Sequence, residues 1–344
     1  MLNMMKELCA MPGISGREHR VCEYIAAQLQ DAPAVSDIRV DRMGNCIVSL
    51  KGRQPAPKKV LFAAHMDEVG GIVTSIMDDG YLRFDTVGGI TPDVLFSRQV
   101  WVNGHAGVIG GKAVHQCRGE EKTKIPTVRN MLIDIGADSK EEARSVVKEG
   151  DAVTFSANCL PLHNDVFCAK ALDNRAGCAL LLQLAHTEPE YDITLVFTVQ
   201  EEIGLRGAVT AAYAVQPEIA VVVDATTAAD SAGVPSDKQV CRMGDGPVVS
   251  FMDRQTMYDS ALYAYIRDLA EKNGIPTQTK TMVAGGNDAG AFQRAKEGAY
   301  VAAVSLPCRY IHSPSCVLKE QDITNTYRLL ELLFNALPAW EKTV

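Results

Sequence analysis

Four uninterrupted apolar runs are the clearest pattern in this chain: VLFAAH at 60–65, ITLVFTV at 193–199, IAVVV at 219–223 and YVAAVSL at 300–306. Stretches with helical periodicity lie between or beside them, at 174–186, 207–213 and 256–273. Fully apolar strands that alternate with helices are typical of a sheet buried on both faces. The chain is therefore predicted to be an α/β protein whose sheet is flanked by helices.

The first fifty residues add further elements to this pattern. A short helix is predicted at 3–11, and the Pro-Gly dipeptide that follows breaks it. Ser15 and Glu18 have the S-x-x-E spacing of a capping box, which predicts a second helix from Ser15 to about Leu29. Strand-like segments follow at 38–41 and 46–50.

The stretch from about Gly71 to Lys170 follows a different pattern. Short alternating segments are separated there by turns that contain glycine, which favours a small β-rich unit. One helix is predicted from Ser139, which has the capping-box spacing with Glu142, to Lys148. Because this unit interrupts the α/β pattern, we expect an inserted, barrel-like β domain without catalytic groups at 72–164, inside a main domain made of 1–71 and 165–344.

Composition narrows the class of protein. The chain has 344 residues, of which 47% are hydrophobic, and a formal net charge of -8, which argues against a nucleic-acid partner. Its 10 cysteines include no CxxC pair, so free thiols are the better interpretation. The N-terminus lacks the features of a signal peptide, and no apolar run reaches membrane-spanning length. We therefore expect a cytoplasmic protein without a membrane segment.

Ionisable side chains follow the carboxyl ends of the apolar runs, where open α/β sheets bind their ligands. Asp173, in ALDNRAG just before a predicted helix, is a further candidate for the same crevice. Taken alone, Asp173 can be read as a helix N-cap, and the neighbouring Glu201 and Glu202 can be read as a solvated charge pair. Together the set offers imidazoles and carboxylates without thiolates, which suits Zn2+, Co2+ or Mn2+. The residues at the strand ends are His65, Asp67, Glu201, Glu202, Asp224 and His312.

This set is larger than one tetrahedral ion needs, so two ions that share a carboxylate are predicted. Adjacent side chains of extended chain point in opposite directions. One residue of the Glu201-Glu202 pair can therefore bind metal while the other holds the attacking water. Asp67, two residues from His65, is placed to accept the second ring N–H of that histidine and to set its tautomer.

Six strings in this chain resemble those of the glutamyl aminopeptidase and tetrahedral aminopeptidase family of dinuclear metallopeptidases. They occur in the family's order and cover nearly the whole chain; QEEIGLRGA with RYIHSP is the most specific match. Two departures bear on the substrate pocket: Cys316 stands where many relatives have glutamate, and Asn287 where threonine is usual. The strings are HMDEVG (65–70), KALDNRAG (170–177), QEEIGLRGA (200–208), VVVDAT (221–226), GGNDAGA (285–291) and RYIHSPS (309–315).

The resemblance implies a role for each candidate. His65, Asp173 and Asp224 would hold one ion, and Asp173, Glu202 and His312 the other, with Asp173 bridging. Glu201 would be the general base and acid, and Asp67 would orient His65. The family further implies a mixed sheet like that of zinc peptidases, peptide substrates, a β-rich domain that shapes subunit contacts, and homo-oligomers that are commonly twelve-subunit shells.

Other functions stay open at this stage. The same metal site would suit a deacylase acting on N-acyl amino acids or acylated sugars, and paired carboxylates are also used by glycosidases. A binding shell with structural metals is a fourth interpretation, and a thiol nucleophile at Cys316 is a fifth. Arg254 and Arg309 are the basic candidates for substrate preference. The remaining histidines are expected to be structural: His19, His105, His115, His163 and His186.

Overall fold

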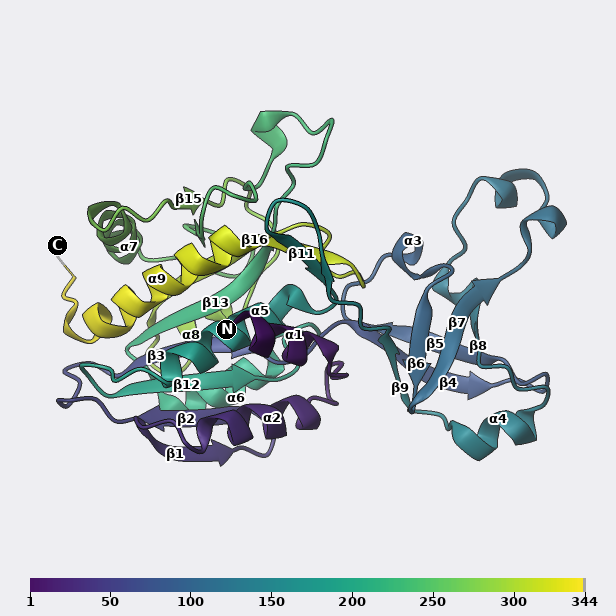
Figure 1. The fold of residues 1–344 in the computed structure, drawn as a ribbon, viewed down its shortest axis with the longest axis horizontal. Coiled ribbons are helices and arrows are strands. Elements are labelled where there is room, and N and C mark those ends of the chain that lie inside the picture. The colour runs from purple at the N-terminus through teal and green to yellow at the C-terminus, as the bar shows by residue number, and fades with distance from the viewer. Residues whose placement is uncertain (343–344) are drawn as a thin grey trace.

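The computed structural model describes residues 1–342 and places an eight-stranded mixed sheet at the centre of its larger part (Figure 1). The strand order is β1-β2-β12-β3-β13-β16-β14-β15. Strands β12, β3, β13 and β16 are parallel neighbours, and β2 and β14 flank them in antiparallel pairing. The bounds are β1 Val35–Val40, β2 Cys46–Leu50, β3 Val60–His65, β12 Ile193–Thr198, β13 Ile219–Thr227, β16 Tyr300–Cys308, β14 Val248–Val249 and β15 Gln278–Thr279.

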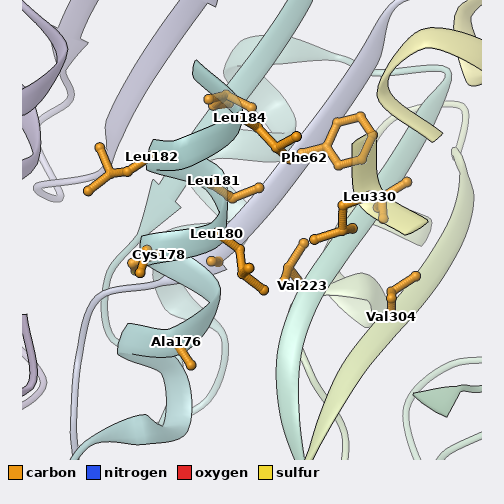
Figure 2. Close-up of a cluster of buried hydrophobic side chains, with 14 of the residues drawn as sticks. Phe62, Ala176, Cys178, Leu180, Leu181, Leu182, Leu184, Val223, Val304 and Leu330 are labelled. Atoms are coloured by element: carbon orange, nitrogen blue, oxygen red, sulfur yellow. The ribbon is translucent and has the colours of Figure 1, made fainter. Parts of the chain in front are cut away.

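Helices cover both faces of this sheet because its central strands are apolar on both sides. Phe62 of β3 faces the larger cluster, whereas its neighbour Leu61 faces the smaller one, as strand geometry requires. In the larger cluster, side chains of α5 and α9 meet those of β3, β13 and β16 (Figure 2). That face carries α1 Leu2–Ala10, α2 His19–Leu29, α5 Leu172–Ala185, α7 Ser260–Lys272 and α9 Glu320–Ala336, and the other carries α6 Arg206–Val215 and α8 Ala289–Gln293.

A closed barrel of six antiparallel strands lies beside the larger part (Figure 1). Its order is β4-β5-β8-β7-β6-β9, and it encloses a core of its own that includes Val73, Phe84 and Ile133. Closure leaves no free sheet edge. Its elements are β4 Gly70–Ile76, β5 Leu82–Val87, α3 Pro92–Leu95, β6 Gln99–Val102, β7 His105–Gly111, β8 Met131–Asp134, α4 Lys140–Val146 and β9 Ala152–Phe155, with 3-10 turns at Val114–Gln116, Gly119–Lys122 and Val128–Asn130.

A small sheet joins the segment that follows the barrel in the chain to a strand near the C-terminus. Strands β10 Leu160–Pro161 and β11 Val166–Ala169 pair with β17 Cys316–Lys319 in antiparallel register. Two more 3-10 turns occupy Ser236–Lys238 and Leu337–Ala339. No helix within residues 1–342 is long and apolar enough to cross a membrane.

The predicted α/β class with a barrel-like insert is confirmed, and so is the cap of α4, where Ser139 accepts a hydrogen bond from the Glu142 N–H. The domain boundaries at 72 and 164 stay a prediction. Two predicted helix starts are wrong. Helix α2 begins at His19, because Ser15 donates to Asp67 and the Glu18 carboxylate accepts the N–H groups of Gly16 and Gln200, so the two do not form a capping box. Helix α7 begins at Ser260 rather than 256, because the Asp259 carboxylate caps its first turn.

Candidate metal centre

Three neighbouring parallel strands bring the first donors to one place. His65 ends β3, and Thr198, its partner in the parallel register, ends β12 just before Glu201. Asp224 lies in β13, two residues beyond the Val222–Ala63 pair, and therefore level with His65. Because β-strand side chains alternate, His65, Thr198 and Asp224 share one face of the sheet.

Asp173 lies between two imidazoles. Its Oδ1 is 3.2 Å from Nε2 of His65, and its Oδ2 is 3.6 Å from Nε2 of His312. The His65 Nε2 is also 3.6 Å from Oδ1 of Asp224, and the His312 Nε2 is 3.4 Å from Oε2 of Glu202. Two groups of three donor atoms, each with its atoms within 4.8 Å of one another, thus share Asp173.

Glu201 lies at the edge of this arrangement. Its Oε2 is 4.0 Å from Nε2 of His65, farther than the Asp173 and Asp224 oxygens. A third group of donors joins His65, Glu201 and Glu202, so the geometry alone also permits Glu201 to be a ligand. The distances favour Asp173 and Asp224 as partners of His65 and leave Glu201 as the less engaged carboxylate.

Asp67 is completely buried and orients several of these groups. Its Oδ1 is 3.4 Å from Nδ1 of His65 and accepts the N–H of Glu201 at 3.0 Å. Its Oδ2 accepts the N–H of Glu202 at 3.1 Å and the hydroxyl of Ser15 at 2.6 Å. A proton on Nδ1 of His65 is therefore held on the Asp67 side, which leaves Nε2 free as a ligand atom.

Electrostatics make this buried set suitable for a cation. Burial raises the pKa of Glu201 and of Glu202 well above the usual range, and it raises the pKa of Asp224 as well. Burial alone would lower the pKa of His65, but hydrogen bonds to Asp173 and Asp224 outweigh it and raise that pKa. Crowded buried carboxylates repel one another when ionised, and a divalent cation supplies the missing positive charge. The donors present therefore fit a metal site.

Comparison with known proteins identifies the family. Residues 44–329 match the model of the M42 glutamyl aminopeptidase family. The chain belongs to this family. It is 38% identical over 335 residues to a putative aminopeptidase of Acetivibrio thermocellus (96% of this chain, 97% of that protein) and 33% identical over 353 residues to the lysyl aminopeptidase of Pyrococcus furiosus (99% and 98%).

A solved relative has the same fold. The TET1 peptidase of Pyrococcus horikoshii, described as assembling into a tetrahedron or a large octahedral shell, superposes with a TM-score of 0.86 at 34% identity (97% of this chain, 99% of that one). The predicted resemblance to this family of metal-dependent aminopeptidases is confirmed.

Several residues of this M42 peptidase matter although the sequence did not single them out. Nδ1 of His312 is 2.8 Å from the carbonyl oxygen of Gly89, in the loop between β5 and α3. The inserted unit therefore touches a candidate ligand through its backbone. Asp288 is buried beside Thr198, whose hydroxyl donates to Asp288 Oδ2, while Oδ1 has no hydrogen-bond partner among residues 1–342. Burial raises the pKa of Asp288 to about 7.

Other candidates lie outside the donor groups. The five histidines predicted to be structural are in none of the groups found among the described residues. Arg309 makes a two-point ion pair with Asp230, at 2.6 and 2.7 Å, so it is not a free cation for a substrate. Arg254 is exposed. Cys316 is buried and lies with Asp173, Glu202 and His312 along a slot of about 10 Å³.

A wider cleft beside this slot is a different feature. It has a volume of about 770 Å³ and lies between the N-terminal segment and the barrel. None of the candidate metal ligands lines it; its lining includes Gly13, Arg17, Trp101, Phe155 and Lys170. Phe155 and Lys170 also line the slot beside the donors, so they form the wall between the two spaces.

Proposed function

We propose that this M42 chain is an aminopeptidase with two divalent ions per subunit, and that it removes N-terminal residues from short peptides. His65, Asp173 and Asp224 would hold one ion, and Asp173, Glu202 and His312 the other. The observation that carries the proposal is Asp173, whose two oxygens face two different imidazoles. Mixed nitrogen and oxygen donors suit Zn2+ or Co2+, with Mn2+ as an alternative.

The residues of this chain would divide the chemistry of hydrolysis. The ions, when bound, would polarise the peptide carbonyl and lower the pKa of an attacking water. Glu201 would accept the proton of that water as the C–O bond forms. It would return the proton to the leaving amine as the C–N bond breaks. Asp67 would hold both the His65 ring and the Glu201–Glu202 backbone, so that base and ligands keep one geometry.

The test is turnover of paired substrates by the purified protein. A panel of aminoacyl-nitroanilides and their N-acetylated counterparts is assayed after treatment with a chelator and after reloading with Zn2+, Co2+ or Mn2+. We expect hydrolysis of substrates with a free α-amine only, loss of activity on chelation and recovery on reloading. Hydrolysis of the N-acetylated series would instead support a deacylase.

The remaining interpretations predict other results. A glycosidase would retain its activity toward sugar substrates after chelation, because its two carboxylates need no metal. A binding shell would bind two ions per subunit and hydrolyse neither series. Measurement of metal content by elemental analysis in parallel separates these outcomes from a failure to load the site.

We further propose that the chain assembles in the cytoplasm into a closed homo-oligomeric shell, with twelve subunits as the first arrangement to test. The TET1 relative supports this, and so does the outer face of the barrel, where Trp101 of β6 and Val108 of β7 are each 45% exposed. Large exposed apolar side chains on neighbouring strands are typical of contact surfaces. The 10 cysteines, all free, fit a reducing compartment.

A further inference from the structure

The segment Leu8–Glu18, here called the N-terminal strap, joins α1 to α2 and contacts two of the loops that carry the candidate ligands. Beside the loop after β3, the Glu68 N–H donates to the carbonyl oxygen of Gly13 at 3.0 Å, and the Gly13 N–H donates to the Glu68 carboxylate at 3.1 Å. Ser15 donates to Asp67. At the loop after β12, Glu18 accepts the N–H of Gln200 at 3.0 Å. The strap is thus part of the support of the site.

A buried charge cluster joins the strap to the third loop, the one before Asp173. Lys170 donates from Nζ to both carboxylate oxygens of Glu68, at 2.7 and 2.8 Å, and to the carbonyl oxygen of Met11 at 2.9 Å. The side chains of Lys170 and Glu68 are each only 2% exposed. All three donors of the ammonium group are therefore used.

Arg175 completes this cluster and is fully buried. Its guanidinium donates to the carbonyl oxygens of Met66 and Leu8, each at 2.6 Å, and of Gly13 at 3.3 Å. It also lies 3.9 Å from the Glu68 carboxylate. A Cβ on Gly13 would stand 2.7 Å from Arg175 Nη2, so the strap approaches as closely as it does only because residue 13 is glycine.

The cluster lies directly beside the ligands in the chain. Glu68 is three residues after His65, and Lys170 is three residues before Asp173. Separation of the two charges of a buried ion pair leaves each charge uncompensated, which costs free energy. Such a pair therefore resists any change in the distance between its two partners. The Glu68–Lys170 pair therefore opposes any change in the separation of the His65 imidazole and the Asp173 carboxylate.

We propose that Glu68, Lys170 and Arg175 are positioning residues of the metal centre, and that through the strap they set the affinity of the site for divalent ions. The inference rests on the proposed dinuclear function. A purely electrostatic role predicts the opposite sign: if Lys170 acted only through its charge, it would repel cations, and its removal would tighten metal binding. Positioning predicts weaker binding, because a ligand pair that is free to shift holds metal less firmly.

The experiment measures the Zn2+ dissociation constants of wild type and Lys170→Met by competition with a chromophoric chelator. We expect about 10- to 100-fold weaker binding in the variant, which is the range typical when a residue that supports a metal ligand is removed. We also expect kcat to recover substantially when metal is saturating. Lys51→Met removes the same charge at an exposed pair with Asp192, whose lysine is 64% exposed, and should leave the affinity unchanged. An unchanged or tighter affinity in Lys170→Met would overturn the proposal.

Two further variants keep the result interpretable. Leu333→Ala removes a fully buried side chain of α9 and destabilises the fold without touching the strap, so its Zn2+ affinity should match wild type. If Lys170→Met does not fold, Gly13→Ala takes its place. Its Cβ would stand 2.7 Å from Arg175 Nη2 and displace the strap from the cluster, so Zn2+ binding should weaken about 10-fold, and no weakening would overturn the proposal. A wild type that binds no metal would instead refute the proposed function.

Discussion

At the scale of single residues, the candidate site separates groups that the sequence presents as equivalent. Glu201 and Glu202 are neighbours, yet the Glu202 carboxylate faces His312, whereas that of Glu201 lies 4.0 Å from His65. Asp67 accepts the backbone N–H of both glutamates, so the direction of each side chain follows from its place in one held turn. The division of roles between them can be tested directly.

The variants Glu201→Gln and Glu202→Gln should differ in metal content and in turnover. Glu201→Gln should still bind two ions per subunit but lose turnover by at least about 10²–10⁴-fold, because it retains its size and loses its basicity. Glu202→Gln replaces an anionic ligand with a weaker neutral one, so an ion should be lost or bound loosely, and excess metal should partly restore activity. Metal analysis alongside kinetics distinguishes them. Loss of an ion from Glu201→Gln alone would mean that the roles are reversed.

The buried Asp288 predicts a pH dependence of stability in the metal-free protein. Its pKa is about 7 in the folded chain and near 3.9 when unfolded, so the folded state binds more protons between these values. Stability should therefore fall as pH rises from about 4 to 7, by up to about 4 kcal/mol, and then level off. The raised pKa values of Glu201, Glu202 and Asp224 act in the same direction, so Asp288→Asn should lack only the part of the fall due to Asp288 and should be more stable than wild type at pH 8.

Urea unfolding of the chelated protein at pH 5 and pH 8 checks this expectation. The advantage of Asp288→Asn over wild type should be larger at pH 8 than at pH 5, since the wild-type carboxyl is ionised in both states only at the higher pH. Equal differences at the two pH values would show that Asp288 does not titrate in this range.

At the scale of elements, the site depends on where loops from both parts of the chain meet. The Gly88-Gly89 turn follows β5 of the barrel and supplies the carbonyl oxygen that orients His312. Gly88 has a φ of +85°, and a Cβ there would stand 2.7 Å from Val69 Cγ1 and 3.3 Å from Glu202 Cβ. The turn is therefore both conformationally and sterically restricted to glycine.

We expect Gly88→Ala to displace this turn, weaken the ion held by His312 and lower kcat/KM by about 10- to 100-fold. Gly104→Ala is a matched control, because Gly104 has a φ of +82° and no other described atom would lie within 4 Å of a Cβ added there. Both variants carry the same backbone strain, but only Gly88→Ala should alter metal content and kinetics. Equal activity in the two variants would show that the turn does not support the site.

At the scale of the whole molecule, the barrel and the α/β part have separate cores, and their contact is where the metal centre receives support from both. The barrel also presents exposed apolar side chains on its outer face. If these side chains bury against other subunits, the shape of the assembly would control which peptides reach the site. The oligomeric state is thus part of the functional proposal.

Light scattering at micromolar concentration should give a mass many times the 37.2 kDa of one chain. The physical reason is that contacts repeated around a closed shell bury apolar surface that a monomer would expose. Sedimentation at several protein concentrations serves as a control for non-specific association. A stable monomer with full peptidase activity would contradict the proposal.

The sequence by itself determined those features of the protein that have a local physical cause. Apolar runs marked β3, β12, β13 and β16, because a strand buried on both faces must be apolar throughout. The same runs located His65 and Asp224, since parallel strands bring their carboxyl ends to one edge. Short segments of alternating polar and apolar residues, separated by turns that contain glycine, marked the barrel. Family resemblance then supplied a set of roles that these donor positions are consistent with.

Only the tertiary structure decided how distant segments support the site. Ser15 has the local spacing of a helix cap, but its hydroxyl bonds to Asp67, fifty-two residues away. Arg309 is tied to Asp230, and Gly89 of the barrel orients His312. No local pattern encodes these partners, because each contact follows from the packing of whole elements. Sequence periodicity reports which side chains are buried, whereas their hydrogen-bond partners depend on which loops folding brings together.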